Sequence, residues 1–234
     1  MSVMPISVAD VAKKLDHAVL KPQATNADLE AAAAMCRRRG VGCLCVRSAD
    51  VENAARLLSG SDVVLASVIG FPHGAQRADV KALEAARAIA DGACELDMVM
   101  NIGAFLSGQA SVVLADLAAV VGEARAAARP VLVKVILETC LLSRDQIAAA
   151  CLLAEEAGAD YVKTSTGFAE HGATPEAVAT MLEAVGGRLG VKASGGIRSW
   201  SEAVRYLAMG CGRIGVGDAV GILDGAEPAD GSTY

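Results

Sequence analysis

The sequence predicts an α/β fold, a single (β/α)8 TIM barrel, and three observations support that class. Short runs rich in Val, Ile and Leu alternate with Ala-rich helical stretches along all 234 residues. Runs such as Val131-Leu132-Val133 do not alternate apolar with polar residues, which is typical of parallel strands covered on both faces. Eight such runs recur at intervals of about 20–35 residues, the repeat expected when each barrel strand is followed by a helix.

These runs predict eight strands. They are Leu15–Leu20, Val41–Val46, Val63–Ile69, Ala93–Met98, Val131–Leu137, Asp160–Lys163, Gly190–Ala193 and Gly212–Ile214. An open, doubly wound sheet is the alternative architecture. The dinucleotide fingerprint G-x-G-x-x-G does not follow the first expected strand, so the barrel is favoured.

Helices between these strands are recognised by their caps. A Ser or Thr followed three residues later by an acid or Gln is a capping box. The pattern occurs at Thr25 with Asp28, Ser143 with Gln146, and Ser199 with Glu202. Thr174-Pro175-Glu176 is typical of an N-cap followed by an N1 proline and a first-turn acid. Gly40 is placed to end the helix that begins after Thr25.

No linker, low-complexity block or change of composition divides the chain. We therefore expect one domain over residues 1–234, with a flexible C-terminal tail at about 225–234. Hydrophobic residues make up 53% of the chain and aromatic residues 3%, which predicts a large core built from Ala, Val, Leu and Ile.

The net charge of −6 argues against nucleic acid or an anionic membrane as the main partner. A small phosphorylated ligand is still compatible, because backbone N–H groups can bind an anion locally. No apolar run reaches the roughly 18 residues of a membrane span, and the N-terminus lacks a signal-peptide pattern. We expect a cytoplasmic protein.

The seven cysteines form no C-x-x-C pair, and the three histidines stand far apart in the sequence. A zinc site needs closely spaced Cys and His ligands. Neither a metal nor another cofactor is expected, and the cysteines are interpreted as buried, reduced thiols.

Two related sequence motifs contain the candidate catalytic residues. V-K-T-S-T-G at 162–167 and V-K-A-S-G-G at 191–196 are 29 residues apart, about one strand–helix unit. Lys163 and Lys192 would then project from the C-terminal ends of neighbouring strands into one barrel mouth. Solvent-exposed strand-end lysines are the structural alternative. Two close cations disfavour each other's protonation, and an uncharged lysine can attack a carbonyl carbon to form a Schiff base.

Charged residues also interrupt the other apolar strands. Lys134 is expected to form a buried ion pair with Glu95 or Asp97 on the preceding strand. Asp97 could handle protons at the reaction end of the barrel, or it could merely neutralise the lysines. Asp16 is a further polar residue inside the first strand.

Glycine pairs follow the last two expected strands, at Gly195-Gly196 and at Gly215 and Gly217. In barrels, the loops after strands 7 and 8 commonly hold a substrate phosphate through glycine N–H groups and a helix N-terminus. Each pair alone could be only a tight turn. Together, and at those two loops, they indicate a phosphate site.

A family resemblance appears at these same residues. The words occur in order as LDHAVLKPQAT (15–25), VIGFPHGA (68–75), ELDMVMNIGA (95–104), LVKVILET (132–139), AGADYVKTSTGF (157–168), GATPE (172–176), VKASGGIR (191–198) and RIG (213–215). They resemble the 2-deoxyribose-5-phosphate aldolase family, which consists of class I, metal-free lyases on a (β/α)8 barrel. The resemblance implies reversible cleavage of 2-deoxy-D-ribose 5-phosphate to acetaldehyde and D-glyceraldehyde 3-phosphate, in a cytoplasmic homo-oligomer, often a dimer.

By position in the matching motifs, the resemblance implies that Lys163 carries the Schiff base, that Lys192 favours its unprotonated form, and that Asp97 transfers protons. Asp16 is a second candidate for proton transfer. Some members end in a flexible tail whose terminal tyrosine assists proton transfer, which makes Tyr234 a candidate. Substrate contacts are expected from Cys45, Lys134, Thr166, Gly167, Gly195, Gly196, Gly215, Gly217 and Asp218.

The sequence departs from the family at three places. Ala18 stands where the family usually has a threonine, and Arg47-Ser48 replaces an Asn or Ser followed by Pro. Asp218 lies where the family usually presents a serine pair to the phosphate. An acid there favours an alternative, the same aldolase chemistry on unphosphorylated aldehydes or deoxysugars. A sugar-phosphate isomerase or sensor without a covalent step is a third reading.

Overall fold

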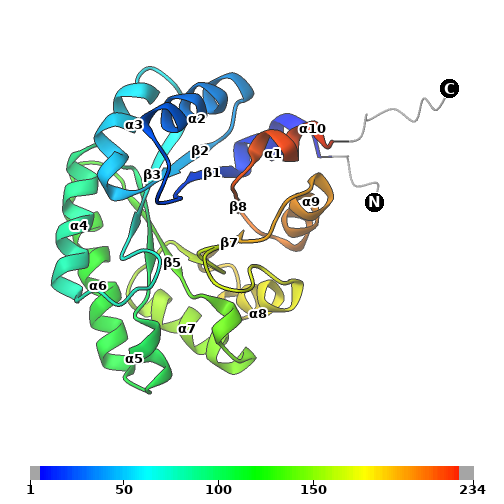
Figure 1. The fold of residues 1–234 in the computed structure, drawn as a ribbon. Helices are drawn as coiled ribbons and strands as arrows, with labels where there is room; N and C mark the ends of the chain where they lie inside the picture. The colour runs from blue at the N-terminus through cyan, green and yellow to red at the C-terminus, as the bar shows by residue number, and fades with distance from the viewer. Residues whose placement is uncertain (1–5, 227–234) are drawn as a thin grey trace.

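The computed structural model describes residues 6–226 and consists of eight parallel strands closed into a barrel. Figure 1 shows the strands at the centre and the helices around them. The strands are β1 (Leu15–Val19), β2 (Cys43–Val46), β3 (Val64–Ile69), β4 (Glu95–Val99), β5 (Leu132–Ile136), β6 (Tyr161–Lys163), β7 (Gly190–Ser194) and β8 (Arg213–Val216). Each strand pairs with its neighbour in the sequence, and β8 pairs with β1. The predicted TIM barrel is therefore confirmed.

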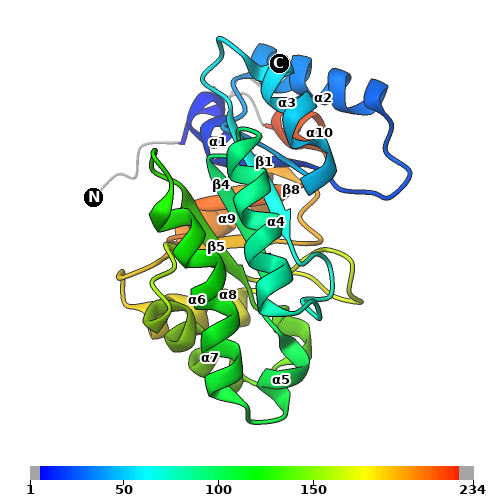
Figure 2. The same ribbon diagram turned by 90° about the vertical axis from the view of Figure 1, so that its left-hand side faces the viewer.

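Helices follow every strand. They are α2 (Asn26–Arg39), α3 (Val51–Leu58), α4 (Ala78–Ala90), α5 (Ile102–Leu106), α6 (Ala110–Ala126), α7 (Arg144–Glu156), α8 (Pro175–Val185), α9 (Trp200–Met209) and α10 (Ala219–Asp224). A further helix, α1 (Val8–Lys14), precedes β1 and packs beside α10 (Figure 1). Short 3₁₀ turns cover Ser48–Asp50 and Thr139–Leu141. Figure 2 shows the long helices α4 and α6 packed side by side.

All eight expected strands are present, and their ends differ from the expected ones by one or two residues. The second strand begins at Cys43 instead of Val41, because Val41 N donates to Cys36 O of α2 and Gly42 N donates to Ala12 O of α1 instead of to a neighbouring strand. Asp97 was expected near the end of its strand but lies at the centre of β4. Helices α1 and α5 were not predicted from the sequence.

The predicted helix caps are confirmed. All three capping boxes are present, with hydrogen bonds in both directions between the cap and the third helical residue. Thr174 caps α8, whose first residue is Pro175, and Gly40 ends α2 in the left-handed conformation. These local interactions explain why the helix starts could be located from sequence.

The main hydrophobic core lies between the barrel and the helices. A smaller cluster lies within the β1–β3 side of the barrel and contains Leu20, Cys43, Cys45, Ala66 and Val68. None of the helices within residues 6–226 is long and apolar enough to cross a lipid bilayer. The predicted C-terminal tail and Tyr234 lie outside the described residues, apart from Gly225 and Ala226.

Candidate active site

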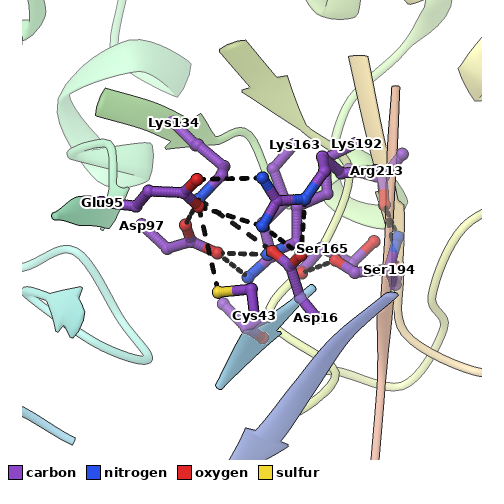
Figure 3. Close-up of polar contacts among 12 residues, drawn as sticks. Asp16, Cys43, Glu95, Asp97, Lys134, Lys163, Ser165, Lys192, Ser194 and Arg213 are labelled. Carbon is purple, nitrogen blue, oxygen red and sulfur yellow. Dashed lines mark hydrogen bonds and ion pairs between the residues drawn. The ribbon is translucent and has the colours of Figure 1, made fainter. Parts of the chain in front are cut away.

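The interior of the barrel contains charged side chains where many barrels are apolar. Because strand side chains alternate between the two faces, one set of alternating positions points inward from each strand. Figure 3 shows how these side chains meet. We call them the charged network; it comprises Asp16 of β1, Glu95 and Asp97 of β4, Lys134 of β5, Lys163 of β6, Lys192 of β7 and Arg213 of β8.

The two lysines singled out in the sequence lie opposite each other, because Lys163 of β6 pairs in register with Lys192 of β7. Their ammonium groups meet at one atom. Lys163 Nζ donates to Asp97 Oδ2 at 2.8 Å, and Lys192 Nζ donates to the same oxygen at 2.6 Å. Lys192 also donates to Asp16 Oδ2. The arrangement of two lysines in one barrel mouth, expected from the repeated sequence word, is present.

The second oxygen of Asp97 accepts a hydrogen bond from Lys134 Nζ at 2.8 Å, and Lys134 also contacts Glu95 Oε2 at 2.5 Å. The predicted buried ion pair of Lys134 is therefore confirmed, with both candidate acids. Asp97 thus connects three lysines from three successive strands (Figure 3).

The remaining cation of the charged network is Arg213. It donates to Asp16 Oδ1 at 2.7 Å and to Glu95 Oε1 at 2.9 Å within the barrel. Its guanidinium neutralises these two carboxylates, and it does not line the pocket described below.

Burial and charge act in opposite directions on these groups. Burial alone would raise the pKa of Asp97, but the charges of Lys134, Lys163 and Lys192 outweigh it and hold that pKa well below the usual value. Burial alone would lower the pKa of Lys192, but Asp16 and Asp97 outweigh it and raise that pKa. Asp97 is therefore an anion and Lys192 a cation at neutral pH.

Asp16, Cys43 and Glu95 place three possible metal-ligand atoms within 4.8 Å of one another. Both carboxylates already bind ammonium or guanidinium groups of the charged network. Burial also raises the pKa of the Cys43 thiol well above its usual value, so the thiolate that a metal needs is disfavoured. These residues fit the ion-pair network and do not fit a metal site.

A pocket of about 200 Å³ opens above the two lysines at the C-terminal ends of the strands. Most residues that were expected to contact substrate line it. They are Cys45, Thr166, Gly167, Gly195, Gly196, Gly215 and Gly217, together with Asp16, Lys163 and Lys192. The pocket is also lined by residues that were not predicted from the sequence, namely Leu20, Lys21, Phe168, Ser194 and Ile197. Lys21 and Ser194 directly follow predicted strands, which was the available signal for those two.

Glycines shape the rim of this pocket where loops pass closely. A Cβ on Gly172 would lie 2.0 Å from the carbonyl oxygen of Gly195, so these two loops meet backbone to backbone. A Cβ on Gly215 would lie 2.7 Å from Ser194 Cβ and 3.2 Å from Lys192 Cε. Within the described part of the chain, the N–H groups of Gly195, Gly196 and Gly217 have no protein acceptor. This wall can donate hydrogen bonds to an anion.

Two residues expected to contact substrate lie away from the pocket. Lys134 is fully buried beneath Asp97, and its ammonium is held by carboxylates. Asp218 is exposed, and its Oδ1 accepts a hydrogen bond from Gly221 N at 2.9 Å as the N-cap of α10. The capping interpretation of Asp218 is thus the one present in the structure.

Arg47, which follows β2, and Arg198, which follows β7, do not line the pocket either. Arg47 pairs with Asp50 and donates to the carbonyl oxygens of Lys21, Pro22 and Ala24, which ties down the β1–α2 loop. Arg198 is exposed at the start of α9.

The fold and the site together define a class of protein. A parallel eight-stranded barrel that aims an ion-paired lysine at a pocket with an N–H-lined wall is the arrangement of a lysine-dependent barrel aldolase, which is a lyase. The family model described as DeoC/LacD family aldolase matches residues 10–218, and the chain belongs to that family.

Several relatives support this membership. A deoxyribose-phosphate aldolase of Brevibacillus brevis is 47% identical over 222 residues, covering 95% of this chain and 98% of that protein. One of Streptococcus suis is 48% identical over 219 residues, covering 94% and 97%. The solved deoxyribose phosphate aldolase of Aeropyrum pernix, described as a tetramer, superposes with a TM-score of 0.86 at 34% identity, covering 93% of this chain and 91% of that one.

Proposed function

We propose that this chain catalyses the reversible cleavage of 2-deoxy-D-ribose 5-phosphate to acetaldehyde and D-glyceraldehyde 3-phosphate through a Schiff base on Lys163. The observation that carries the proposal is the shared hydrogen bonding of Lys163 and Lys192 to one oxygen of Asp97, at the base of the pocket. Among the described residues, Lys163 has this single carboxylate partner, whereas Lys192 has two. Lys163 is therefore held by fewer ion pairs than Lys192, which supports its assignment as the nucleophile.

The reaction starts when the neutral amine of Lys163 attacks C1 of the open-chain sugar. The resulting carbinolamine loses water and becomes a protonated imine. A base then removes the proton of the C3 hydroxyl, the C2–C3 bond breaks, and its electron pair moves into the imine to form an enamine. D-glyceraldehyde 3-phosphate leaves. Protonation of the enamine at C2 and hydrolysis of the imine release acetaldehyde and restore the lysine.

Asp97 and Lys192 are proposed to serve the proton transfers of this sequence. Asp97 lies 2.8 Å from the amine that must lose protons, and it bonds in turn to Lys192. The Asp97 carboxylate can accept a proton from the ammonium of Lys163 and pass it to water, which carries it to the substrate carbon, while Lys192 stays an ammonium. Asp16 is proposed to serve proton transfer indirectly, through its ion pair with Lys192.

The unpartnered N–H groups of Gly195, Gly196 and Gly217 support a phosphate site on the β7–β8 side of the pocket. We therefore expect kcat/KM for 2-deoxyribose 5-phosphate to exceed that for 2-deoxyribose by about a hundredfold or more. The alternative of an unphosphorylated substrate depended on the carboxylate of Asp218 lying at the phosphate site. That carboxylate accepts a hydrogen bond from Gly221 N instead, so this alternative is not favoured.

The deciding experiment is borohydride reduction in the presence of acetaldehyde, followed by mass mapping. One two-carbon unit is expected on Lys163, and none on Lys192 or Lys134. The variant Lys163→Met should lose both the label and the cleavage activity. A label on Lys192 would overturn the assignment, and no label on any lysine would favour a non-covalent isomerase or sensor.

We further propose that the chain works as a single domain over residues 1–234 and as a homo-oligomer, with a dimer as the expected unit. Light scattering of the purified protein tests the dimer, and a monomer would contradict it. A cytoplasmic location and a proton-transfer role of Tyr234 stay predictions. Deletion of Tyr234 should slow proton exchange at the methyl carbon of acetaldehyde without slowing imine formation.

A further inference from the structure

Glu138, directly after β5, has an unusual backbone conformation. Its φ of 58° makes it the one non-glycine residue with positive φ within residues 6–226. The side chain is also buried, with 3% of the residue exposed. A left-handed conformation and a buried carboxyl both cost free energy, so such a residue persists where its surroundings hold it, often near a functional site.

The backbone on either side of Glu138 forms a bulge against β6. Leu137 N donates to Lys163 O at 3.0 Å, and Thr139 N donates to Thr164 O at 2.9 Å. The two donors are two residues apart, whereas their acceptors are adjacent, so Glu138 is the extra residue. A bulge of this kind turns a side chain away from the direction that regular alternation would give it.

The redirected carboxyl group binds the loop that follows Lys163. Thr166 Oγ1 donates to Glu138 Oε2 at 2.5 Å, and Thr166 N donates to Glu138 Oε1 at 3.2 Å. Thr166 Oγ1 in turn accepts a hydrogen bond from Phe168 N at 3.0 Å. Two of the three residues from Thr166 to Phe168 are therefore hydrogen-bonded, directly or through one hydroxyl, to Glu138.

This loop segment closes one side of the pocket. Thr166, Gly167 and Phe168 all line it, whereas Glu138 does not. The ring of Phe168 meets Phe71 of the β3–α4 loop edge to face, with centroids 5.1 Å apart and planes at 86°. Phe168 is 48% exposed, so its position depends mainly on this aromatic contact and on the hydrogen bond that its N–H donates to Thr166 Oγ1.

We propose that Glu138 is a positioning residue that acts through Thr166, holding the 166–168 segment in the conformation that closes the pocket over the substrate bound to Lys163. The inference rests on the proposed aldolase function and adds to it a residue that does not touch the substrate. Burial raises the pKa of Glu138, and the hydrogen bonds from Thr166 and the charge of Lys163 oppose that rise. The carboxylate form, which accepts both Thr166 donors, is the form that holds the loop.

The test compares Glu138→Gln with Thr166→Val, which removes the hydroxyl at nearly constant shape. Both variants should raise KM for 2-deoxyribose 5-phosphate about tenfold or more, since each breaks a hydrogen bond to a charged group. The rate of borohydride trapping of acetaldehyde on Lys163 should change less than about threefold, because acetaldehyde is too small to need the closed loop. Thr166→Ser, which keeps the hydroxyl, should stay much closer to the wild type than Thr166→Val.

A double variant separates positioning through Thr166 from a general loss of folding. Glu138→Gln with Thr166→Val together should raise KM no further than the larger single effect, since both remove one contact. Thr139→Val is the matched control. It deletes the neighbouring buried hydroxyl, which has no hydrogen-bond partner among the described residues, and it should leave KM unchanged.

Additive effects in the double variant, or an unchanged KM in Thr166→Val, would overturn the proposal. A rise of KM matched by an equal fall in the rate of acetaldehyde trapping would also overturn it, because Glu138 would then act on Lys163 itself. If Glu138→Gln fails to fold, Glu138→Asp takes its place in the single and double variants, because its shorter side chain withdraws the carboxylate from Thr166. A wild-type enzyme that neither cleaves the sugar phosphate nor traps acetaldehyde would refute the proposed function instead.

Discussion

Lys163 and Lys192 are paired in register on neighbouring strands, and both donate to the same oxygen of Asp97. Their surroundings are otherwise unequal, because Lys192 also binds Asp16 whereas Lys163 has no second carboxylate partner among the described residues. The second carboxylate helps keep Lys192 charged, and its charge acts on the neighbouring amine across the shared oxygen. This inequality supports the different roles proposed for the two lysines, although they occur in nearly the same sequence motif.

The charge of Lys192 can be removed by Lys192→Met. Asp97 would then face Lys163 without a competing cation, which favours the ammonium form of Lys163. We expect the pH–activity profile to move to higher pH and kcat/KM at neutral pH to fall by about 10²-fold or more. Lys81→Met is the matched control. Lys81 is also fully buried and paired, with Asp116, but outside the pocket, so its loss should cost stability and leave the profile in place. An unmoved profile in Lys192→Met would contradict the argument.

Asp97 stabilises the fold as well as serving the site. Removing its charge in Asp97→Asn leaves three buried lysines short of a carboxylate partner and should lower the free energy of unfolding by about 3–5 kcal/mol at pH 7. The folded-state pKa of Asp97 lies well below its usual value of 3.8, so this stabilisation is complete above about pH 4 and is lost as pH falls towards the folded-state value.

Urea denaturation of the wild type and Asp97→Asn between pH 3 and pH 7 measures this contribution. The difference between the two proteins should be largest near neutral pH and should shrink below about pH 4. Comparing two proteins cancels the titration of the other carboxyl groups. A difference that stayed constant down to pH 3 would show that the carboxylate charge of Asp97 is not what stabilises the network.

Asp218→Ser tests whether the acid after β8 affects phosphate binding. Because the carboxylate caps α10 and serine is an equally favoured cap, we expect the preference for 2-deoxyribose 5-phosphate over 2-deoxyribose to change less than about twofold. Asp218→Ala, which removes the cap, should lower the free energy of unfolding by about 1 kcal/mol. A large rise of the preference in Asp218→Ser would mean that the carboxylate repels the phosphate after all.

Gly215→Ala tests the close packing of β8 against the lysine pair. The added Cβ would lie 2.7 Å from Ser194 Cβ and 3.2 Å from Lys192 Cε, so the stem of Lys192 must shift. We expect a loss of about 1–3 kcal/mol in unfolding free energy, together with reduced kcat. Gly122→Ala, on the exposed face of α6 with no atom within 4 Å of the new Cβ, should instead stabilise the fold by up to about 1 kcal/mol. Equal stability of the two variants would refute the packing argument.

Much of the architecture could be predicted because the signals are local. A capping box joins residues three positions apart, as at Ser199 and Glu202, and a buried parallel strand is a continuous apolar run. The repeated V-K-x-S-x-G word placed Lys163 and Lys192 on neighbouring strands at one end of the barrel before any coordinate was known. The candidate pocket followed from that placement and from the glycines after β7 and β8.

The ion-pair partners of the charged residues could not be predicted, because these residues meet only when the eight strands close into the barrel. Arg213 meets Asp16 and Glu95 across 197 and 118 residues of sequence, and a shift of one residue in strand register would turn its side chain to the other face of the sheet. Regular alternation continued beyond β5 would place Glu138 on the side of Lys134, but a bulge turns it to Thr166. The sequence by itself determined the barrel and its two lysines, since those follow from neighbouring residues. The tertiary structure decided which oxygen each cation binds, because hydrogen bonds between distant strands depend on register to within a single residue.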